Sequence, residues 1–446
     1  MARMNQQPAA LSRRRLLQVG GLAAGAAVLP GCSSSGDEMA FWNFYGPAKG
    51  IDTSLSDWFV RLAADWNDSH RQRLRLRYLP NTDYIGGPTL QTAFSAGAGP
   101  DVFLLSPGDF LRYLNAGALA DLTGFLPAGI QQEYLPGSLE TRTVDGRVYG
   151  LPLEREPLGL FYSVDAFERA GLAAADAPTD WESLLDVAAE LTTPDQFGLL
   201  LETSPGYYQN FTWYPFLWMA GGSPITRDQR RASFDGDAAH RALRLWQDAI
   251  NRGVAPRRAQ GTGGNDSISN LAFGYCAMQQ VGIWAIGELA LRAPDFRYGV
   301  VPLPAPAGRD SISSIGGWAM VANAHSSHRD EAGEFVAWAL GRDDAACIDR
   351  GRRWNTELKR NLPARRKVQQ AAERRGAFDD PAMRMFADRI ASTGRGEPRY
   401  PVPVYRAISD AVQACQLDGV SADDAAATAA ETIDTYLRGY EGVPIR

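Results

Sequence analysis

Hydrophobic residues in the segment 39–117 switch between two periods, and this switching constrains the fold more than any other feature of the chain. The stretch RLRLRYLP (73–80) alternates apolar residues with arginine, which is the period of a β-strand. The stretch SLSDWFVRLAADWNDS (54–69) repeats large apolar residues every four positions, which is typical of a helix. Further strands are expected at 39–46 and 100–106, and further helices at 88–97 and 108–117. Because strands that alternate with helices form parallel sheets covered by helices, the sequence predicts an α/β fold.

The rest of the chain has the elements of a second lobe. The stretch VDGRVYGLPLEREPLGLFYS (144–163) carries an Asp-Gly turn between two alternating segments, and it leads the chain into that lobe. Helices are expected at 180–192 and 330–341, strands at 197–202, 297–304 and 316–324, and mainly helix towards the C-terminus. With roughly 410 residues beyond its leader, the chain is long enough for two domains.

An export signal precedes these elements. Residues 1–31 hold four arginines and no acid. Their apolar run of about 15 residues is shorter than the ~20 that cross a bilayer as a helix. The stretch SRRRLLQ (12–18) resembles a twin-arginine signal, and LPGC (29–32) resembles a lipobox. We therefore expect a signal peptide at 1–31, a lipid on Cys32 and a flexible tether over 32–38. The alternative is ordinary cleavage nearby, with Cys32 incidental.

The chain without this leader carries 41 basic and 51 acidic residues, a formal charge near −10. This balance argues against a nucleic-acid partner and is compatible with a body beside a membrane. Of the 45 basic residues in the whole chain, 42 are arginine, and the basic block between Asp349 and Gly376 is expected to form solvated helix faces. Three further cysteines, Cys276, Cys347 and Cys415, allow at most one internal disulfide, with Cys347–Cys415 as the candidate pair.

Common catalytic motifs are missing from the sequence. It has no G-x-S-x-G, no P-loop, no H-E-x-x-H, no dinucleotide fingerprint after a strand, and only four histidines. His325 and His328 lie three apart in NAHSSHRD, where a solvated loop is favoured over a metal site. The sequence therefore predicts no cofactor and no metal, and it gives little support to histidine-based nucleophilic catalysis.

Carboxylates set among aromatic residues are the chemistry that the sequence does offer. Glu154 and Glu156 are two apart in LPLEREPLGLFYS, which on an extended chain sends both to one side. Sugars need such groups, because their hydroxyls bind to carboxylates while their C–H faces lie on aromatic rings. Other candidates of this kind are Asp83, Tyr84, Asp109, Tyr208, Asn210, Trp284 and Glu288. Two other interpretations stay open: most of the aromatics are core residues, or the paired acids serve an exported glycoside hydrolase.

Seven stretches occur in a fixed order along nearly the whole chain after the leader. They are FWNFYG, GPDVFLLSPGDFLRYLNAGALADLTGFL, VDGRVYGLPLEREPLGLFYSVDAFERAGL, PTDWESL, LAFGYCAMQQVGIWAI, RYGVVPLPAP and GGWAMVANAHSSHRDEAGEFVAWAL. In this order they resemble the extracellular solute-binding proteins of ABC importers, in the carbohydrate-binding group that includes maltose-binding protein. The third stretch is the most specific match.

The resemblance implies an α/β architecture with a two-lobed fold of the periplasmic-binding-protein type. Each lobe would be a mainly parallel sheet flanked by helices, with the ligand cleft at the hinge. Because the chain would cross the hinge more than once, both lobes are discontinuous. They are expected at 39–152 with 296–330, and at 153–295 with 331–446.

The resemblance also implies roles for individual residues. Asp109 and Glu156 match acids that bind sugar hydroxyls, while Trp284 and Tyr405 match aromatics that stack on sugar rings. Glu154 sits at a place without a fixed role in the family. The first strand with its ligand-facing loop, and a glycine-rich turn near the ligand, add Trp42, Tyr45, Gly46, Gly316, Gly317 and Trp318.

We therefore expect a monomeric receptor that is exported and anchored to the outer face of the cytoplasmic membrane by a lipid on Cys32. It would capture a carbohydrate, an amino sugar or short oligosaccharide included, by hinge closure and deliver it to an ABC permease without catalysis. Arg155 and Arg399 are the only basic side chains expected beside the acids, which favours an acidic cleft that disfavours sugar phosphates. The alternatives are the glycoside hydrolase and a receptor for another polar solute, such as a glycerophosphodiester, an oligopeptide or a polyamine.

Overall fold

The computed structural model describes residues 38–47, 53–85 and 87–445. The expected signal peptide, the lipid-bearing Cys32 and the tether up to residue 37 lie outside these residues. The chain from Met39 onward forms one unit, and its two large sheets are described below.

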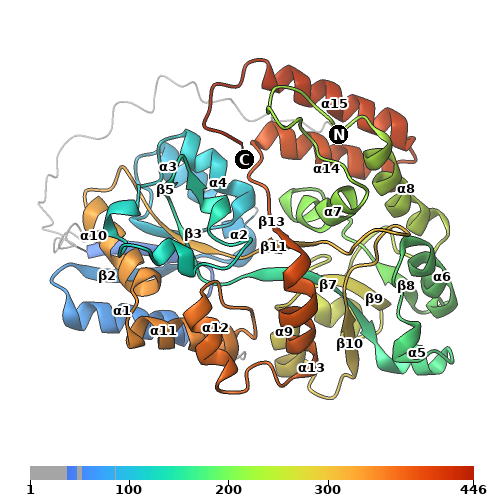
Figure 1. Cartoon of the computed structure of the whole chain (residues 1–446), viewed down its shortest axis with the longest axis horizontal. Helices are drawn as coiled ribbons and strands as arrows, with labels where there is room; N and C mark the ends of the chain where they lie inside the picture. The colour runs from blue at the N-terminus through green and yellow to red at the C-terminus, as the bar shows by residue number, and fades with distance from the viewer. Residues whose placement is uncertain (1–37, 48–52, 86, 446) are drawn as a thin grey trace, which may run out of the picture. The chain divides into compact units, whose positions relative to one another are not determined.

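The first sheet has the strand order β2-β1-β3-β12-β6. Its strands β2 and β3 are labelled in Figure 1. Its strands are β1 (Glu38–Asn43), β2 (Arg73–Tyr78), β3 (Val102–Leu105), β6 (Leu151–Pro152) and β12 (Ala319–Ala322). β1 and β3 run parallel, while β12 runs antiparallel to both β3 and β6. The helices between the first strands are α1 (Ser54–Ser69), α2 (Asn81–Ile85), α3 (Thr89–Ser95) and α4 (Pro107–Asn115). The predicted order of strands and helices is confirmed here, and α2 is an addition to it.

Helix α1 shows why the sequence pattern predicted this segment correctly. Trp58, Leu62 and Trp66, which are four positions apart, are all buried on one side of the helix. The indole N–H of Trp66 also donates a hydrogen bond of 2.7 Å to the carbonyl of Gln72, in the turn that leads to β2. The apolar side of the helix and the turn after it are therefore fixed by the same residue.

The second sheet has the order β13-β11-β7-β9-β8, and β10 also pairs with β7. Its strands are β7 (Glu156–Ser163), β8 (Phe197–Leu200), β9 (Cys276–Gly282), β10 (Tyr298–Val301), β11 (Ser313–Gly316) and β13 (Gly394–Gly396). β7 is buried along its whole length and runs antiparallel to β9, β10 and β11. The α/β class is confirmed, but the sheets are mixed and not mainly parallel. Hydrophobic periods predict strands, whereas strand direction depends on the long connections between them.

Strand pairing divides the segment 296–330 between the two sheets. β10 and β11 pair with β7 in the second sheet, and only β12 pairs with strands of the first sheet. The assignment of the whole segment to the first lobe is therefore corrected for β10 and β11. The other lobe boundaries stay a prediction.

A hairpin precedes β7, as the Asp-Gly pair predicts. It consists of β4 (Thr143–Val144) and β5 (Arg147–Val148), which pair antiparallel. Asp145 and Gly146 both have positive φ, at 49° and 75°, which is the backbone that a two-residue hairpin turn requires.

Helices make up most of the remaining chain (Figure 1). They are α5 (Val164–Arg169), α6 (Trp181–Leu191), α7 (Tyr207–Met219), α8 (Asp237–Asn251), α9 (Ala285–Arg292), α10 (Arg329–Val336), α11 (Ala345–Arg352), α12 (Arg366–Glu373), α13 (Pro381–Met385), α14 (Val402–Gln416) and α15 (Ala422–Leu437). α14 packs against α7, α8 and α15. In α7 every residue from Gln209 to Met219 is buried, so most of its aromatics are core residues. No helix of the described residues is both long and apolar enough to cross a membrane.

Cys276, Cys347 and Cys415 are all buried free thiols. The candidate disulfide Cys347–Cys415 is therefore wrong. Cys347 lies in α11, where its Sγ contacts the carbonyl of Ala339 at 3.4 Å, and Cys415 lies in α14. Cys276 begins strand β9, and each of the three thiols fills its surroundings as a small apolar side chain.

The basic block between Asp349 and Gly376 is not solvated throughout. Arg352 and Arg365 are each only 4% exposed, and the side chain of Lys359, which is 10% exposed, pairs with two acids described below. Arg365 donates to two main-chain carbonyls, at 3.1 and 2.8 Å. The expectation of solvated helix faces is wrong for these three residues. Arg352 pairs with the nearby acids Asp349 and Glu357, whereas carbonyls and carboxylates from earlier segments bind Arg365 and Lys359.

Candidate ligand-binding site

Glu154 and Glu156 share one ammonium group. Lys359 Nζ lies 3.5 Å from Glu154 Oε1 and 2.5 Å from Glu156 Oε1. Glu154 is fully buried, and its two oxygens accept the main-chain N–H of Trp318 at 2.9 Å and the indole N–H of Trp354 at 2.5 Å. The two acids thus lie on one side of the chain, as their spacing predicts.

The electrostatics of this group are those of a buried ion cluster. Burial raises the pKa of Glu154, and Lys359 offsets only part of this rise. Burial acts to lower the pKa of Lys359, but Glu154 and Glu156 outweigh it and the pKa lies well above its usual value. Lys359 Nζ also lies 5.3 Å from the centre of the Tyr45 ring. The ammonium is therefore charged at every pH at which the protein would work.

Glu156 keeps one oxygen for other partners. Lys359 and Asn361 both donate to Oε1, at 2.5 and 2.8 Å. Within the part of the chain that the structure describes, the other oxygen of Glu156, Oε2, accepts no hydrogen bond. Glu156 is thus oriented through one oxygen, while the second remains an acceptor for a ligand hydroxyl.

A second group links the starts of α4 and α14. Arg112 Nη2 lies 3.2 Å from Asp109 Oδ1 and donates to the hydroxyl of Tyr405 at 3.4 Å. Burial raises the pKa of Asp109, and Arg112 lowers it in part. The side chains of Asp109 and Arg112 remain 22% and 24% exposed. An acceptor, a donor and an aromatic ring therefore lie together and remain accessible.

Glu397, which follows β13, approaches the start of α4. A Cβ on Gly108 would lie 2.8 Å from Glu397 Oε1 and 3.1 Å from the ring of Tyr207, so glycine is needed for this approach. Burial raises the pKa of Glu397 to about 8, with further contributions from Asp109 and Glu156. At neutral pH the carboxyl group is therefore largely protonated, and it can donate as well as accept.

A third group combines rings and an acid. The ring of Tyr208 lies 6.2 Å from those of Trp284 and Phe211. Its hydroxyl is buried without a hydrogen-bond partner among the described residues. Glu288 accepts a hydrogen bond of 3.1 Å from Ser267, and burial raises the pKa of Glu288 to about 7. A buried hydroxyl without a partner is a costly feature that a bound ligand would satisfy.

The three groups interact with one another. Burial is the main cause of the raised pKa of Tyr207 and of Tyr208. The charge of Glu156 raises both pKa values further, and Tyr405 adds to the rise for Tyr207. Glu156, Trp284 and Tyr405, which come from distant parts of the sequence, therefore lie near two adjacent tyrosines: Trp284 contacts the ring of Tyr208, while Glu156 and Tyr405 are near enough to affect a tyrosine pKa. No cluster of metal-binding side chains occurs among the described residues. The arrangement can bind hydroxyl groups and sugar faces.

Four other expected site residues have different surroundings. The hydroxyl of Tyr84 donates to the carbonyls of Leu104 and Trp42 and accepts the N–H of Leu104, which fixes it in the first sheet. Arg399 Nη1 donates to three main-chain carbonyls, at 2.7 to 3.4 Å. Trp42 lies under the guanidinium of Arg77, and Asp83 is exposed on α2. We do not carry these four residues into the candidate site.

Gly46 and Asn210 contact other parts of the chain. A Cβ on Gly46 would lie 2.9 Å from the side chain of Tyr78. The amide of Asn210 donates a hydrogen bond of 2.6 Å to the carbonyl of Tyr405, which positions the start of α14. Their expected contact with a ligand stays a prediction.

The glycine-rich turn supports the Glu154–Glu156 cluster. Gly317 has φ of 117°, and a Cβ there would lie 2.5 Å from the carbonyl oxygen of Glu154. A Cβ on Gly316 would lie 3.0 Å from the ring of Phe211. The turn thus needs glycine so that its main chain can approach both Glu154 and the aromatic group. The next residue, Trp318, donates its main-chain N–H to the carboxylate of Glu154.

The sequence did not point to Lys359, Arg112 or Glu397, whereas Tyr207 belongs to the aromatic stretch GYYQNFTWYPFLW, from which only Tyr208 and Asn210 were expected in the site. One signal was available, because Lys359 is one of only three lysines in a chain with 42 arginines. A second signal was the position of Glu397 between glycine and proline in GRGEPRY. The expectation that only Arg155 and Arg399 are basic partners of the acids is corrected: Arg155 binds the carbonyl of Pro363, whereas Lys359 and Arg112 pair with the acids.

A family model described as bacterial extracellular solute-binding protein matches residues 52–346. The chain belongs to this family. An uncharacterised lipoprotein of Streptomyces antibioticus is 29% identical over 286 residues, which are 63% of this chain and 62% of that protein. The arabinooligosaccharide-binding protein of Bacillus subtilis is 23% identical over 334 residues, 71% of this chain and 74% of that protein. The match spans about three fifths of the length of the first curated relatives.

Solved structures of solute-binding proteins share the fold. One from Thermotoga lettingae, bound with α-D-tagatose, aligns with a TM-score of 0.76 at 22% identity, over 90% of this chain and 100% of that one. The fold of this solute-binding protein is therefore the two-domain fold of periplasmic binding proteins, as the resemblance implied.

Proposed function

We propose that this solute-binding protein is a carbohydrate receptor that delivers its ligand to an ABC permease. One observation carries the proposal: acids and aromatic rings from distant segments lie close together. Trp284 lies against Tyr208, Glu397 and Tyr207 both approach Gly108, and Arg112 joins Asp109 to Tyr405. Membership of the family supports it, as do relatives that are named for oligosaccharide binding. Catalysis forms no part of the proposal.

Closure of two lobes around the ligand is the proposed mechanism. Asp109 and Arg112 belong to α4, which follows β3 of the first sheet, whereas Glu156 belongs to β7 of the second. A sugar that binds Asp109 on one side and Glu156 and Trp284 on the other gains all its contacts only in the closed form. Such a ligand shifts the population towards closure by its higher affinity for that form.

The charges of the site favour a ligand that is neutral or bears an amino group. The acids of the site outnumber its basic groups. The acids are Asp109, Glu154, Glu156, Glu288 and Glu397, and the basic groups are Arg112, Arg142 and Lys359. Glu397 is largely protonated at neutral pH, and Arg142 partly offsets the rise that burial causes in its pKa. A phosphate would be repelled by the ionised acids, and Lys359 is already bound by two carboxylates. Oligosaccharides and amino sugars are therefore expected to bind more tightly than glycerophosphodiesters. Polyamines remain compatible with the charges.

Calorimetric titration of the exported protein tests the ligand class. A neutral oligosaccharide, glucosamine, glycerophosphocholine and spermidine are compared under the same conditions. Trp284→Ala is expected to weaken sugar binding at least about tenfold, because a ring that stacks on the ligand is a typical hot spot. Phe273→Ala, at a ring that is 77% exposed and outside the site, is the matched control. Tight binding of glycerophosphocholine alone would overturn the proposal.

The hydrolase alternative predicts turnover of aryl glycosides that is lost in Glu156→Gln. Retaining and inverting glycosidases need a second carboxyl group that can reach the scissile bond. Glu154, the paired candidate, has both oxygens in hydrogen bonds and is fully buried. We therefore expect binding without turnover, and measurable hydrolysis by the wild type would reverse this assignment.

We also propose that the protein acts as a monomer held at the membrane by a lipid on Cys32. The lipoprotein of Streptomyces antibioticus among the relatives supports the anchor. Labelling of producing cells with a palmitate analogue, followed by membrane fractionation, tests it. Label and membrane association are expected to disappear in Cys32→Ser, and a labelled Cys32→Ser protein would contradict the anchor.

A further inference from the structure

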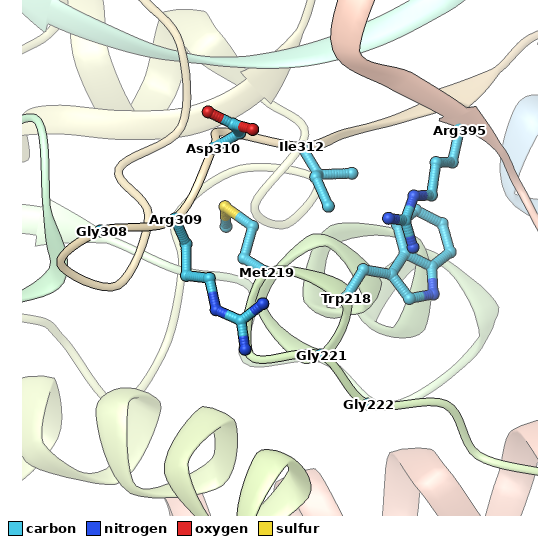
Figure 2. Close-up of a pocket in the computed structure, with 9 residues that line it drawn as sticks. All are labelled: Trp218, Met219, Gly221, Gly222, Gly308, Arg309, Asp310, Ile312 and Arg395. Atoms are coloured by element: carbon cyan, nitrogen blue, oxygen red, sulfur yellow. The ribbon is translucent and has the colours of Figure 1, made fainter.

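A cavity of about 420 Å³ lies at the C-terminal end of α7, outside the candidate site (Figure 2). Trp218 and Met219 come from the end of α7, and Gly221 from the turn after it. The loop before β11 contributes Arg309 and Ile312, and β13 contributes Arg395. Segments from three distant parts of the sequence therefore build this cavity.

Two arginines border the cavity from opposite sides. In Figure 2, Arg309 and Arg395 lie on either side of Met219 and Ile312. The guanidinium of Arg395 lies 5.8 Å from the centre of the Trp218 ring, which is itself stacked on Tyr214 at 5.8 Å and 18°. Such an arrangement holds a guanidinium in place without neutralising its charge.

The guanidinium of Arg309 lies beside the turn after α7. Gly221 has φ of 91°, and a Cβ there would lie 3.5 Å from Arg309 Nη2. Within the described residues no ion pair joins Arg309 or Arg395 to a carboxylate. The side chain of Asp310 on the rim points away from both guanidinium groups in Figure 2. The cavity is therefore lined by two arginines that have no ion-pair partner among the described residues and by one carboxylate, so the formal charge of its lining is positive.

We propose that this cavity binds a small organic anion of the sugar-phosphate or sugar-acid class between Arg309 and Arg395. Guanidinium groups match the geometry of phosphate and carboxylate oxygens. The volume lies within the range of roughly 300 to 1,000 Å³ that small-molecule sites have. Met219 and Ile312 supply an apolar wall for the carbon skeleton of the ligand. The acidic candidate site and this basic cavity would thus bind ligands of different charge.

The test uses D-glucose 6-phosphate and sodium D-glucuronate as probes, with D-glucose as the uncharged control. Titrations are done on the Trp284→Ala protein, in which the candidate site is weakened. At least one anion is expected to bind more tightly than glucose, with an affinity that falls as salt is added. The double variant Arg309→Gln/Arg395→Gln is expected to lower that affinity at least about tenfold, because charge-assisted hydrogen bonds are lost.

Two further variants make the test specific. Arg384→Gln removes another exposed arginine, which pairs with Asp379 at 3.2 Å, and is expected to leave the affinity unchanged. Asp310→Asn removes the one negative charge on the rim and is expected to strengthen binding slightly. Absence of binding by both anions, or equal affinity in the double variant and its parent, would refute this site. Either result would leave the proposed carbohydrate site untouched.

Discussion

Replacing Lys359 with methionine removes the only ammonium in the Glu154–Glu156 cluster. The side chains of Lys359, Glu154 and Glu156 are 10%, 0% and 8% exposed, so water cannot replace the lost partner. Leaving one member of a buried ion pair without its partner typically costs about 3–5 kcal/mol. We expect Lys359→Met to lower the free energy of unfolding by about that amount at pH 8, in urea titrations followed by tryptophan fluorescence.

The loss is expected to depend on pH. The pKa of Glu154 is already raised by burial in the wild type, so this residue contributes most stability below its unfolded pKa of about 4.5 and less as the pH rises. Without Lys359, which lowers that pKa, the rise becomes larger and the variant loses more stability between pH 5 and pH 8. The difference between variant and wild type should therefore be smaller at pH 5 than at pH 8.

Lys367→Met is the matched control for this experiment. Lys367 pairs with Asp343, but the two side chains are 43% and 40% exposed. Exposed pairs contribute about 0–1 kcal/mol, so this variant should differ little from the wild type at either pH. If Lys359→Met were no less stable than Lys367→Met, or if its loss were the same at pH 5 and pH 8, the account of the cluster would be refuted.

Three further predictions concern single groups. Burial raises the pKa of Glu397 from about 4.5 to about 8, so its contribution to stability is full below pH 4.5 and is lost as the pH rises to 8. Glu397→Gln should remove this loss, which amounts to roughly 1.4 kcal/mol for each pH unit of that window, and an unchanged pH profile of the melting temperature would contradict it. Arg399→Ala should lower unfolding free energy by about 1–3 kcal/mol, because carbonyls lose a buried donor, while calorimetric sugar affinity stays unchanged. In Cys32→Ser, a thiol reagent should react with three thiols after unfolding and with none before it, whether or not reductant is present, whereas reductant-dependent thiols would reveal a disulfide.

The elements were predictable where one physical period dominates a segment. Trp58, Leu62 and Trp66 predict helix α1 because a helix repeats every 3.6 residues, and their burial in the structure follows from that period. The Asp-Gly hairpin was predictable for a similar reason, since the required positive φ at Asp145 and Gly146 is a local property. Strand direction was not predictable in this way: β7 has antiparallel neighbours that arrive from 100 residues or more along the chain.

The same distinction between local pattern and distant partners applies to the candidate site. The spacing of Glu154 and Glu156 predicts that they lie on one side, and Lys359 contacts both. The hydroxyl of Tyr84 looked equally suited to a ligand, yet it binds the main chain at Leu104. Nothing in the local sequence distinguishes these cases, because the partners that decide them come from segments far along the chain.

Local periodicity and turn chemistry in the sequence alone determined the α/β class, the early order of strands and helices, and the candidate acids and rings. Only the tertiary structure decided which of those groups are available to a ligand. Burial, and the partners that burial brings, set the charge and accessibility of each group: Glu397 is held largely neutral, Lys359 is bound by two acids, and Arg399 is bound by carbonyls. These partners depend on packing over long sequence distances, which no local pattern encodes.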